Sequence, residues 1–141
     1  MIDELWCIVT VSSAEENLTS YEAEQMISYA RKDRLSKGIT SLVLYCEKNI
    51  LVVLEGKKTD VRNEFQVLMF HSGHNNLIKM YDQKVPERFF GDYPLVFKSM
   101  SKEFRELDDF QEPEQLEYFD EFLSISEPIP NIVRSFIKNN G

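Results

Sequence analysis

His71 and His74 are the only two histidines of the chain, and Ser72 and Gly73 separate them. Imidazole nitrogens are common ligands of zinc, so such a pair could contribute to a metal site. No cysteine lies near the pair in the sequence, and no helical pattern fixes its spacing. We therefore predict two partly exposed loop histidines and no metal site.

The residue types that support catalysis lack the spacing that catalysis requires. The sequence contains no nucleophile elbow, no HExxH motif and, with five glycines in all, no phosphate-binding loop. Cys7 and Cys46 lie inside apolar runs without a CxxC partner, which is typical of small core residues in a reducing compartment. We predict no catalytic residues and no enzymatic activity.

Acidic residues are concentrated in one segment of the chain. Residues 103–127 hold ten acids against the one basic residue Arg105, whereas the whole chain carries a net charge of -8. Such a surface repels phosphate backbones and anionic lipids, which argues against nucleic-acid and membrane partners. We interpret the segment either as a solvated face that aids solubility or as a docking surface for a basic protein.

The first residues and the hydropathy of the chain bear on its location. Met1 is followed by Asp3 and Glu4 rather than by the basic residues of a signal peptide. No apolar stretch approaches the ~20 residues that a membrane-spanning helix needs. We expect a cytoplasmic protein, and the length of 141 residues is typical of one compact domain.

Hydrophobic periodicity predicts the elements that would position a site. Residues 5–13 are rich in β-branched and aromatic side chains, which predicts a strand. Thr19 opens a capping box before a helix with one buried stripe, formed by Ala23, Met26, Ile27 and Ala30. Two further apolar runs, Ile39–Cys46 and Ile50–Leu54, predict a hairpin that ends at Gly56.

The alternation of helix and strand continues after the hairpin. Asp60 is a candidate N-cap of a second helix, which ends at the polar stretch 71–73 and buries Val61, Phe65 and Leu68. Residues 77–83 and 94–100 predict the fourth and fifth strands. The order is therefore β-α-β-β-α-β-β, a ferredoxin-like α+β pattern with a mixed five-stranded sheet and two helices on one face.

Two more amphipathic helices are predicted at the C-terminus. One follows Pro113 and buries Leu116, Phe119 and Leu123, and the other follows Pro130 and buries Ile132, Val133, Phe136 and Ile137. We expect them to cover the opposite face of the sheet, with the 128–130 stretch as the turn between them. Residues 1–100 would form the core domain and residues 101–141 a helical extension packed on it, as one compact unit.

The motifs of the hairpin and of the strands around it resemble the BLUF family, whose members use FAD to sense blue light. The residues that match its pattern are Gly38-Ile39-Thr40, Tyr45, Leu54-Glu55-Gly56, His74, Arg88 and Phe90. The resemblance covers residues 5–100, and the C-terminal helices look like those of short, single-domain members. It implies the same fold as the periodicity, with FAD held between the first two helices.

The resemblance also implies a photoswitch of three side chains, and this sequence departs from all of them. The tyrosine position falls on Thr10, the glutamine position on Val52 and the asparagine position on Arg34, or on Asp33 if the loop slips by one residue. The remaining positions of the family's flavin pocket fall on Ile27, His71, Gly73 and His74.

These departures change the chemistry that the pocket can perform. Val52 has no donor or acceptor, so a flavin seated against it would bury polar groups unsatisfied, at roughly 1 to 3 kcal/mol each. A few such losses would weaken FAD binding by several orders of magnitude, because ~1.4 kcal/mol is tenfold. Thr10 cannot act as a one-electron donor in place of tyrosine. We predict that the protein has lost the switch and does not hold flavin productively.

The same positions have simpler structural explanations. Val52 beside Val53 suits a strand that is buried on both faces, and Thr10 is a good strand residue. Arg34 at a helix end can reach solvent or a C-terminal carbonyl. Alternatively, Arg34 is a cation at the mouth of the pocket that could receive an anionic ligand.

The sequence leads to three hypotheses for function. The first is a BLUF-fold regulatory or interaction module without photochemistry, which forms an oligomer or binds a signalling protein, with residues 103–127 as the candidate docking segment. The second is a photoreceptor of the BLUF family that binds FAD through substitute residues. The third is a binder of another small ligand in the vacated cleft.

Overall fold

The computed structural model places most of the chain in one α+β unit. The residues it describes are 4–14, 20–46, 49–70, 74–91, 94–99 and 113–140. The predicted helix cap at Thr19, the positions His71 and Gly73, and residues 103–112 of the acidic segment lie outside these ranges. Among the described residues, no helix is long and apolar enough to cross a membrane.

A five-stranded mixed sheet forms the centre of the fold, as the sequence predicts. The strands lie in the order β4-β1-β3-β2-β5, and only the pair β2 and β5 is parallel. The strands are β1 (Leu5–Ala14), β2 (Thr40–Cys46), β3 (Asn49–Lys57), β4 (His74–Lys84) and β5 (Val96–Ser99).

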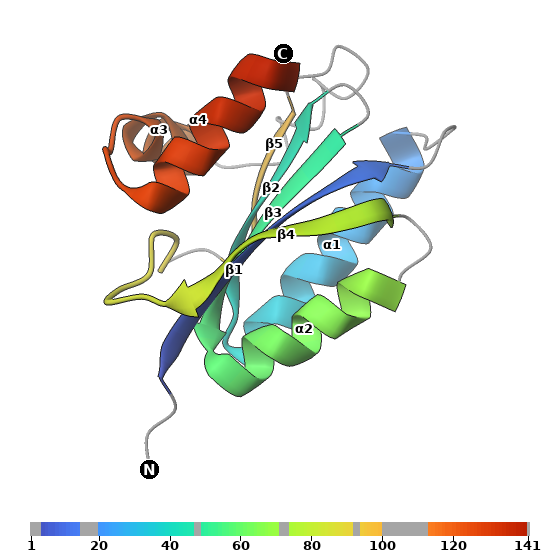
Figure 1. Cartoon of the computed structure of the whole chain (residues 1–141). Helices are drawn as coiled ribbons and strands as arrows, with labels where there is room; N and C mark the ends of the chain where they lie inside the picture. Colours follow the sequence, from blue (N-terminus) through green and yellow to red (C-terminus); the bar gives the residue numbers. More distant parts are fainter. Residues whose placement is uncertain are drawn as a thin grey trace.

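Helices cover both faces of this sheet. Figure 1 shows the helices divided between the two sides of the sheet. The first pair is α1 (Ser20–Lys37) and α2 (Lys58–Phe70), and the second pair is α3 (Pro113–Leu123) and α4 (Pro128–Asn140). The predicted fold class, with its two helical layers, is therefore confirmed.

The central strands are apolar because both of their faces are buried. Successive side chains of a strand point to opposite faces, so adjacent valines of β3 enter different cores. Val52 faces α1 and α2 and is 2% exposed, whereas Val53 belongs to the core under α3 and α4 and is fully buried. The predicted burial of this strand on both faces is confirmed.

Gly38 determines how α1 leads into the sheet. Its φ of 69° lies in the left-handed region, which glycine adopts without the strain that a side chain would cause. The amide of Ile39 then donates to the carbonyl of Arg34 at 2.9 Å. This tight exit brings the last turn of α1 over the beginning of β2.

Gly56 does not end the hairpin as predicted. β3 continues through it to Lys57, because β1 provides a partner for every residue in this stretch, including Trp6 opposite Gly56. A Cβ at Gly56 would lie 3.3 Å from the carbonyl oxygen of Gly38, so glycine serves here for close approach of two backbones. As a consequence α2 begins at Lys58, two residues before the predicted cap.

The predicted turn at residues 128–130 is wrong. Pro128 begins α4, and Ile129 and Pro130 are buried in its first turn. Proline is tolerated there because the first amides of a helix need no partner within the helix. The connection between α3 and α4 is instead formed by residues 124–127, where the amide of Ile125 donates to the carbonyl of Phe122 at 3.1 Å.

The two outer strands differ in length from the prediction. β4 spans 74–84 instead of 77–83, because its pairing with β1 extends to both ends of that strand. β5 is shorter than predicted and covers only Val96–Ser99. These differences leave the strand order unchanged.

Candidate functional site

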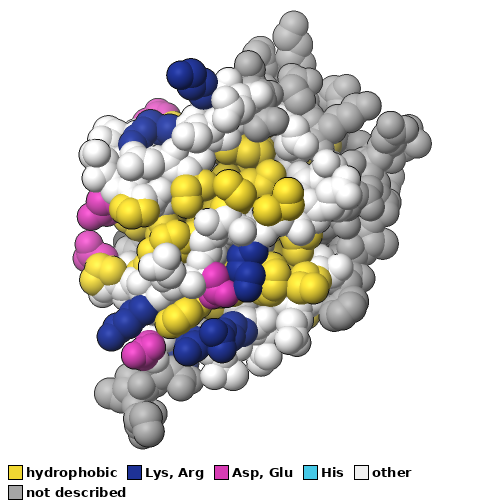
Figure 2. Space-filling model, in the orientation of Figure 1, with side chains coloured by type: hydrophobic (Ala, Val, Ile, Leu, Met, Phe, Trp, Pro, Cys, Tyr) yellow, Lys and Arg dark blue, Asp and Glu magenta, His cyan; other side chains and the backbone are white. Residues whose placement is uncertain are grey.

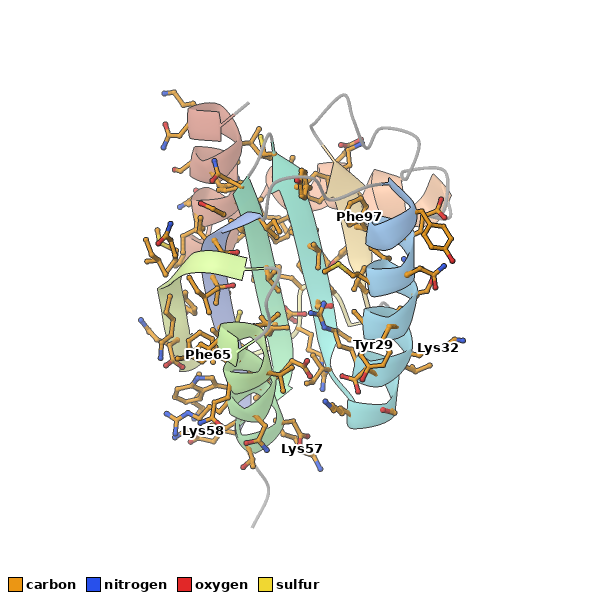
Figure 3. All side chains as sticks on the ribbon, turned by 90° about the vertical axis from the view of Figure 1, so that its right-hand side faces the viewer. Tyr29, Lys32, Lys57, Lys58, Phe65 and Phe97 are labelled. Atoms are coloured by element: carbon orange, nitrogen blue, oxygen red, sulfur yellow. The ribbon has the colours of Figure 1, made fainter. Side chains whose placement is uncertain are left out.

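A cavity of about 280 Å³ lies between α1, α2 and the sheet. Its walls are mainly apolar, with side chains from both helices and from three strands. Figure 3 looks onto this side of the molecule, with α1 and α2 in front of the sheet. The apolar lining consists of Met26, Ile27, Ala30, Val43, Ile50, Val52, Val67, Leu68, Leu95 and Phe97.

Three of the predicted pocket positions meet in this cavity. Ile27 and Arg34 are seven residues apart on α1 and so share one face of the helix. Val52 reaches the same space from β3, and Asp33, the alternative position for Arg34, also lines the cavity. The sequence therefore located a real cavity, and both candidate registers of the loop lead to it.

Thr10 is close to this site but does not line the cavity. It lies on β1, opposite Val52, and is 1% exposed. Its Oγ1 is buried and has no hydrogen-bond partner among the described residues. Thr10 is not one of the residues that line the cavity, so the tyrosine position of the family contributes no group to it.

The histidine and glycine positions cannot be assigned to the cavity. His71 and Gly73 lie outside the described residues. His74 is the first residue of β4, where it pairs with Ala14.

Arg34 is buried, so the expectation that it reaches solvent is wrong. It is 4% exposed, and its Nη1 donates to Oγ of Ser41 at 2.9 Å. That hydroxyl in turn donates to the carbonyl of Pro94 at 2.6 Å. Burial lowers the pKa of the guanidinium, while nearby Glu64 and Asp33 act in the opposite direction.

One nitrogen of this guanidinium is left unpaired. Nε of Arg34 is buried and has no hydrogen-bond partner among the described residues. Buried donors are nearly always paired, because a lost hydrogen bond to water is not replaced otherwise. This nitrogen has almost no accessible surface, so a molecule in the cavity would reach it only if the guanidinium moved.

The rim of the cavity carries a small ion network. Lys37 Nζ lies 2.9 Å from a carboxylate oxygen of Asp33 and 3.2 Å from one of Glu64. The hydrogen bond to Asp33 is the main reason that the pKa of Lys37 is raised. Glu64 is 5% exposed, so the lysine neutralises a carboxylate that is largely removed from water.

A second polar cluster is centred on Glu55, for which sequence reasoning proposed no role. Glu55 lies in β3 and is fully buried. Its carboxylate accepts hydrogen bonds from Thr40 Oγ1 at 3.0 Å, Phe89 N at 2.6 Å and Phe90 N at 2.9 Å. Burial raises the pKa of Glu55, and these hydrogen bonds oppose the rise. An acid inside an apolar strand run was the signal that could have identified it.

Glu55 connects β3 to the C-terminal helices. The two amides it binds belong to residues whose rings pack on α3. The ring centroids of Phe89 and Phe90 lie 5.4 Å and 4.9 Å from that of Phe122, and the ring of Tyr118 lies 5.9 Å from that of Phe90. Hydrogen bonds and ring contacts therefore connect β3 to α3 in an unbroken series.

Both cysteines behave as the sequence predicts, since they are free, buried core residues. Burial is the main cause that raises the pKa of Cys7, and a neutral buried thiol is a poor nucleophile. Among the described side chains, no group of three or more histidines, cysteines or acids is placed to hold a metal ion.

Comparison with known proteins identifies the type of domain. Residues 5–95 match the family model described as BLUF, sensors of blue light using FAD. A search of curated proteins finds no match.

Solved structures of low sequence identity share the fold. The dark-state structure of BlrB, a BLUF protein, superposes with a TM-score of 0.67 at 19% identity, covering 84% of this chain and 94% of BlrB. The photo-activated state of BlsA gives 0.67 at 16% identity, covering 87% and 96%. Klebsiella pneumoniae BlrP1, in a complex with manganese and cyclic diGMP, gives 0.75 at 16% identity, covering 97% of this chain but 33% of BlrP1.

Proposed function

This chain belongs to the BLUF family, and we propose that it is a regulatory, protein-interaction module that has lost the flavin photoswitch. In this proposal it holds no flavin productively and has no catalytic activity of its own. The observation that carries the proposal is the position of Val52 in the wall of the α1–α2 cavity.

The three replaced positions support the loss of the switch. Val52 offers no polar group to a ring in the cavity, and Arg34 stands where the family has an amide side chain. Thr10 does not line the cavity and has no phenol to offer it. Without a rotating amide and a nearby electron donor, absorbed light would have no hydrogen-bond network to rearrange.

The Glu55 cluster supports a role in signalling for the C-terminal helices. It connects the strand beneath the cavity to Phe89, Phe90 and, through their rings, to α3. In this proposal residues 1–100 form the sensor-like domain, and residues 101–141 form the extension that carries its output. The partner is a second copy of the chain or a basic protein that binds the acidic segment 103–127, rather than nucleic acid or a membrane.

One observation favours the alternative that the protein binds FAD and senses light. Arg34 lines the cavity and its buried Nε has no partner among the described residues, so a flavin carbonyl could accept its hydrogen bond after a shift of the guanidinium. A BLUF photoreceptor with an arginine in place of the amide would then hold the ring in another way.

An absorbance spectrum distinguishes the two functions. The full chain is expressed with added riboflavin and purified, and we expect a colourless protein without flavin bands. As a matched control, the triple variant Thr10→Tyr, Arg34→Asn and Val52→Gln should gain flavin, because it restores the polar groups. A yellow wild-type protein whose bands shift to the red under blue light would overturn the proposal. Size-exclusion chromatography with light scattering then tests self-association.

A further inference from the structure

An open groove of about 420 Å³ runs along the surface between α2 and the edge strand β4. Its lining combines the apolar side chains of Ile8, Phe65 and Met69 with the charged side chains of Arg62, Lys79 and Asp82. Met69 is 49% exposed, so apolar surface of the groove remains in contact with water. Apolar surface rimmed by charged groups is typical of a site that another protein covers.

One face of α2 places two cations beside this groove. Lys58, Arg62, Phe65 and Met69 follow at i, i+4, i+7 and i+11, so they share a face of the helix. Figure 3 shows Lys58 and Phe65 on the side of α2 that faces β4. Lys58 Nζ and Arg62 Cζ lie 4.4 Å and 5.4 Å from the ring centroid of Trp6. The ring of Trp6 therefore holds two positive charges at one end of the groove.

Lys58 and Arg62 form no ion pair with the acids that the structure describes. Lys79, in contrast, is paired with Asp82 at 2.7 Å. Figure 2 shows Lys and Arg side chains next to apolar ones in the lower part of this face, where Figure 1 places the beginning of β1 and of α2. The groove therefore has a positive end whose charge is available to a partner.

The opposite charge lies elsewhere on the molecule. Residues 103–127 contain ten acids against one basic residue. Asp120 near the end of α3 and Glu127 in the loop after it are exposed. α2 and α3 cover opposite faces of the sheet (Figure 1), and within the described ranges no ion pair joins the acidic segment to the groove. A single copy therefore presents a positive and a negative surface without pairing them.

A second copy carries the matching surface. The net charge of -8 repels copies from each other, so they associate only if the positive groove of one meets the acidic segment of the other. Complementary charges of this kind orient a partner and disfavour other arrangements. The same contact removes the apolar lining of the groove from water. A second copy therefore matches the groove in both charge and hydropathy.

We propose that the groove between α2 and β4 receives the acidic segment of a second copy, with Lys58 and Arg62 of one protomer facing Asp120 and Glu127 of its partner. The inference rests on the proposed function, because it names the partner and the surface for the role in interaction. The contact joins two different surfaces and is therefore heterologous, so each copy uses both surfaces in a chain or in a closed ring.

Sedimentation velocity of the full chain tests the charges of this contact. We expect self-association at low salt that weakens at about 1 M NaCl, where the screening length falls to ~3 Å. Lys58→Glu combined with Arg62→Glu should raise the dissociation constant about tenfold or more, because both groove positions then repel the acids. Lys32→Glu combined with Lys138→Glu is the matched control, since it changes the net charge equally at exposed lysines of α1 and α4. It should have a much smaller effect.

A mixing experiment tests which two surfaces meet. Asp120→Lys combined with Glu127→Lys reverses charges on the acidic side, and this variant should also self-associate more weakly than the wild type. An equimolar mixture of the groove variant and the acid variant should associate more strongly than either alone, because it contains one intact groove and one intact acidic segment. Circular dichroism shows whether each variant is folded. If one variant is not folded, the other variant and the salt dependence decide the outcome.

Several results would overturn the inference. They are a wild-type protein that stays monomeric at low salt, association that high salt leaves unchanged, equal weakening in the groove variant and its control, and a mixture that associates no more strongly than its components. A colourless protein that stays monomeric would refute this inference but not the loss of the photoswitch. A yellow protein that self-associates through the groove and shifts its bands under blue light would refute the proposed function alone.

Discussion

The two faces of the sheet differ in how completely their side chains fill the space under the helices. Under α3 and α4, Phe90 and Phe122 are fully buried and contact each other and neighbouring rings, and the carboxylate of Glu55 has three donors. Under α1 and α2 there is a cavity of about 280 Å³. The buried groups Thr10 Oγ1 and Arg34 Nε on that side have no partners among the described residues.

The face under α3 and α4 stabilises the fold, whereas the face under α1 and α2 has a cavity that folding does not require. A cavity and buried polar groups without partners each cost free energy, so they persist only where another part of the molecule compensates. The face under α3 and α4 supplies that compensation, because its aromatic rings remove large apolar areas from water. A protein that needed only to fold would have no reason to keep the space between α1 and α2.

Apolar exposure also differs around the sheet. On β4, an edge strand, Ile78 and Met80 are 58% and 51% exposed. Figure 2 shows apolar side chains forming a band on this side, in the region where Figure 1 places β4 and β1. Exposed apolar groups on an edge strand are candidates for contact with another protein, which agrees with the proposed role in interaction.

The largest expected effect on the free energy of unfolding comes from a cavity made on the face under α3 and α4. Phe122→Ala should lower the free energy of unfolding by ~3–5 kcal/mol, because the ring is fully buried among Phe89, Phe90 and Phe119. Ile27→Ala beside the existing cavity should cost clearly less, since its side chain is only partly packed. Urea unfolding measures both values. Equal losses would show that the two faces are packed alike.

Adjacent valines of β3 offer the sharpest comparison of the faces. Val53→Phe should destabilise the protein by about 1–3 kcal/mol, because it overpacks the core under α3 and α4. Val52→Phe points into the cavity and should change stability by less than ~1 kcal/mol. The thermal midpoints of the two variants provide the measurement. A larger loss for Val52→Phe would contradict the presence of usable space on that side.

Glu55→Gln tests whether the stability of the face under α3 and α4 depends on its buried acid. Both carboxylate oxygens accept from backbone amides, Phe89 N and Phe90 N, so the amide group of glutamine must face one of these donors. We expect a loss of ~1–3 kcal/mol in the free energy of unfolding. The exposed Glu121→Gln is the control and should leave the denaturation midpoint unchanged. If the free energy of unfolding of Glu55→Gln equals that of the wild type, the hydrogen bonds of Glu55 do not stabilise the contact between β3 and α3.

The smallest effect is the pH dependence of this acid. Burial raises the pKa of Glu55 above its ordinary value of 4.5, so the folded state binds the proton more tightly than the unfolded state does. The stabilisation from this group is complete below pH 4.5 and is lost as the pH rises through the folded-state pKa. The stability advantage of the wild type over Glu55→Gln should therefore decrease from pH 4.5 upward in urea titrations. An advantage that grows with pH would show the opposite shift.

Local signals were sufficient for most of the fold. Apolar runs in β2 and β3 predicted buried strands because burial on both faces requires apolar residues at every position. Helical spacing predicted α2, α3 and α4. The prediction of a turn at 128–130 was wrong because proline is common both in turns and in the first turn of a helix. Only the packing of Ile129 decides between the two.

The candidate site was predicted in part. The family pattern located Ile27, Arg34 and Val52, which the fold brings to one cavity. The state of Arg34 was not predictable, because its partners Ser41 and Pro94 come from other parts of the chain. The role of Glu55 was not identified from the sequence for the same reason, since its donors lie 15 to 35 residues away along the chain.

The sequence by itself determined the succession of strands and helices, the two-sided burial of β3 and the absence of a polar side chain at Val52, since periodicity and residue type are local properties. Only the tertiary structure decided that Arg34 is buried with an Nε that finds no partner in the described part of the chain, and that Glu55 accepts hydrogen bonds from the backbone of Phe89 and Phe90. Whether a polar group is satisfied depends on partners that folding brings within 3 Å or so, and the linear chain does not record that proximity.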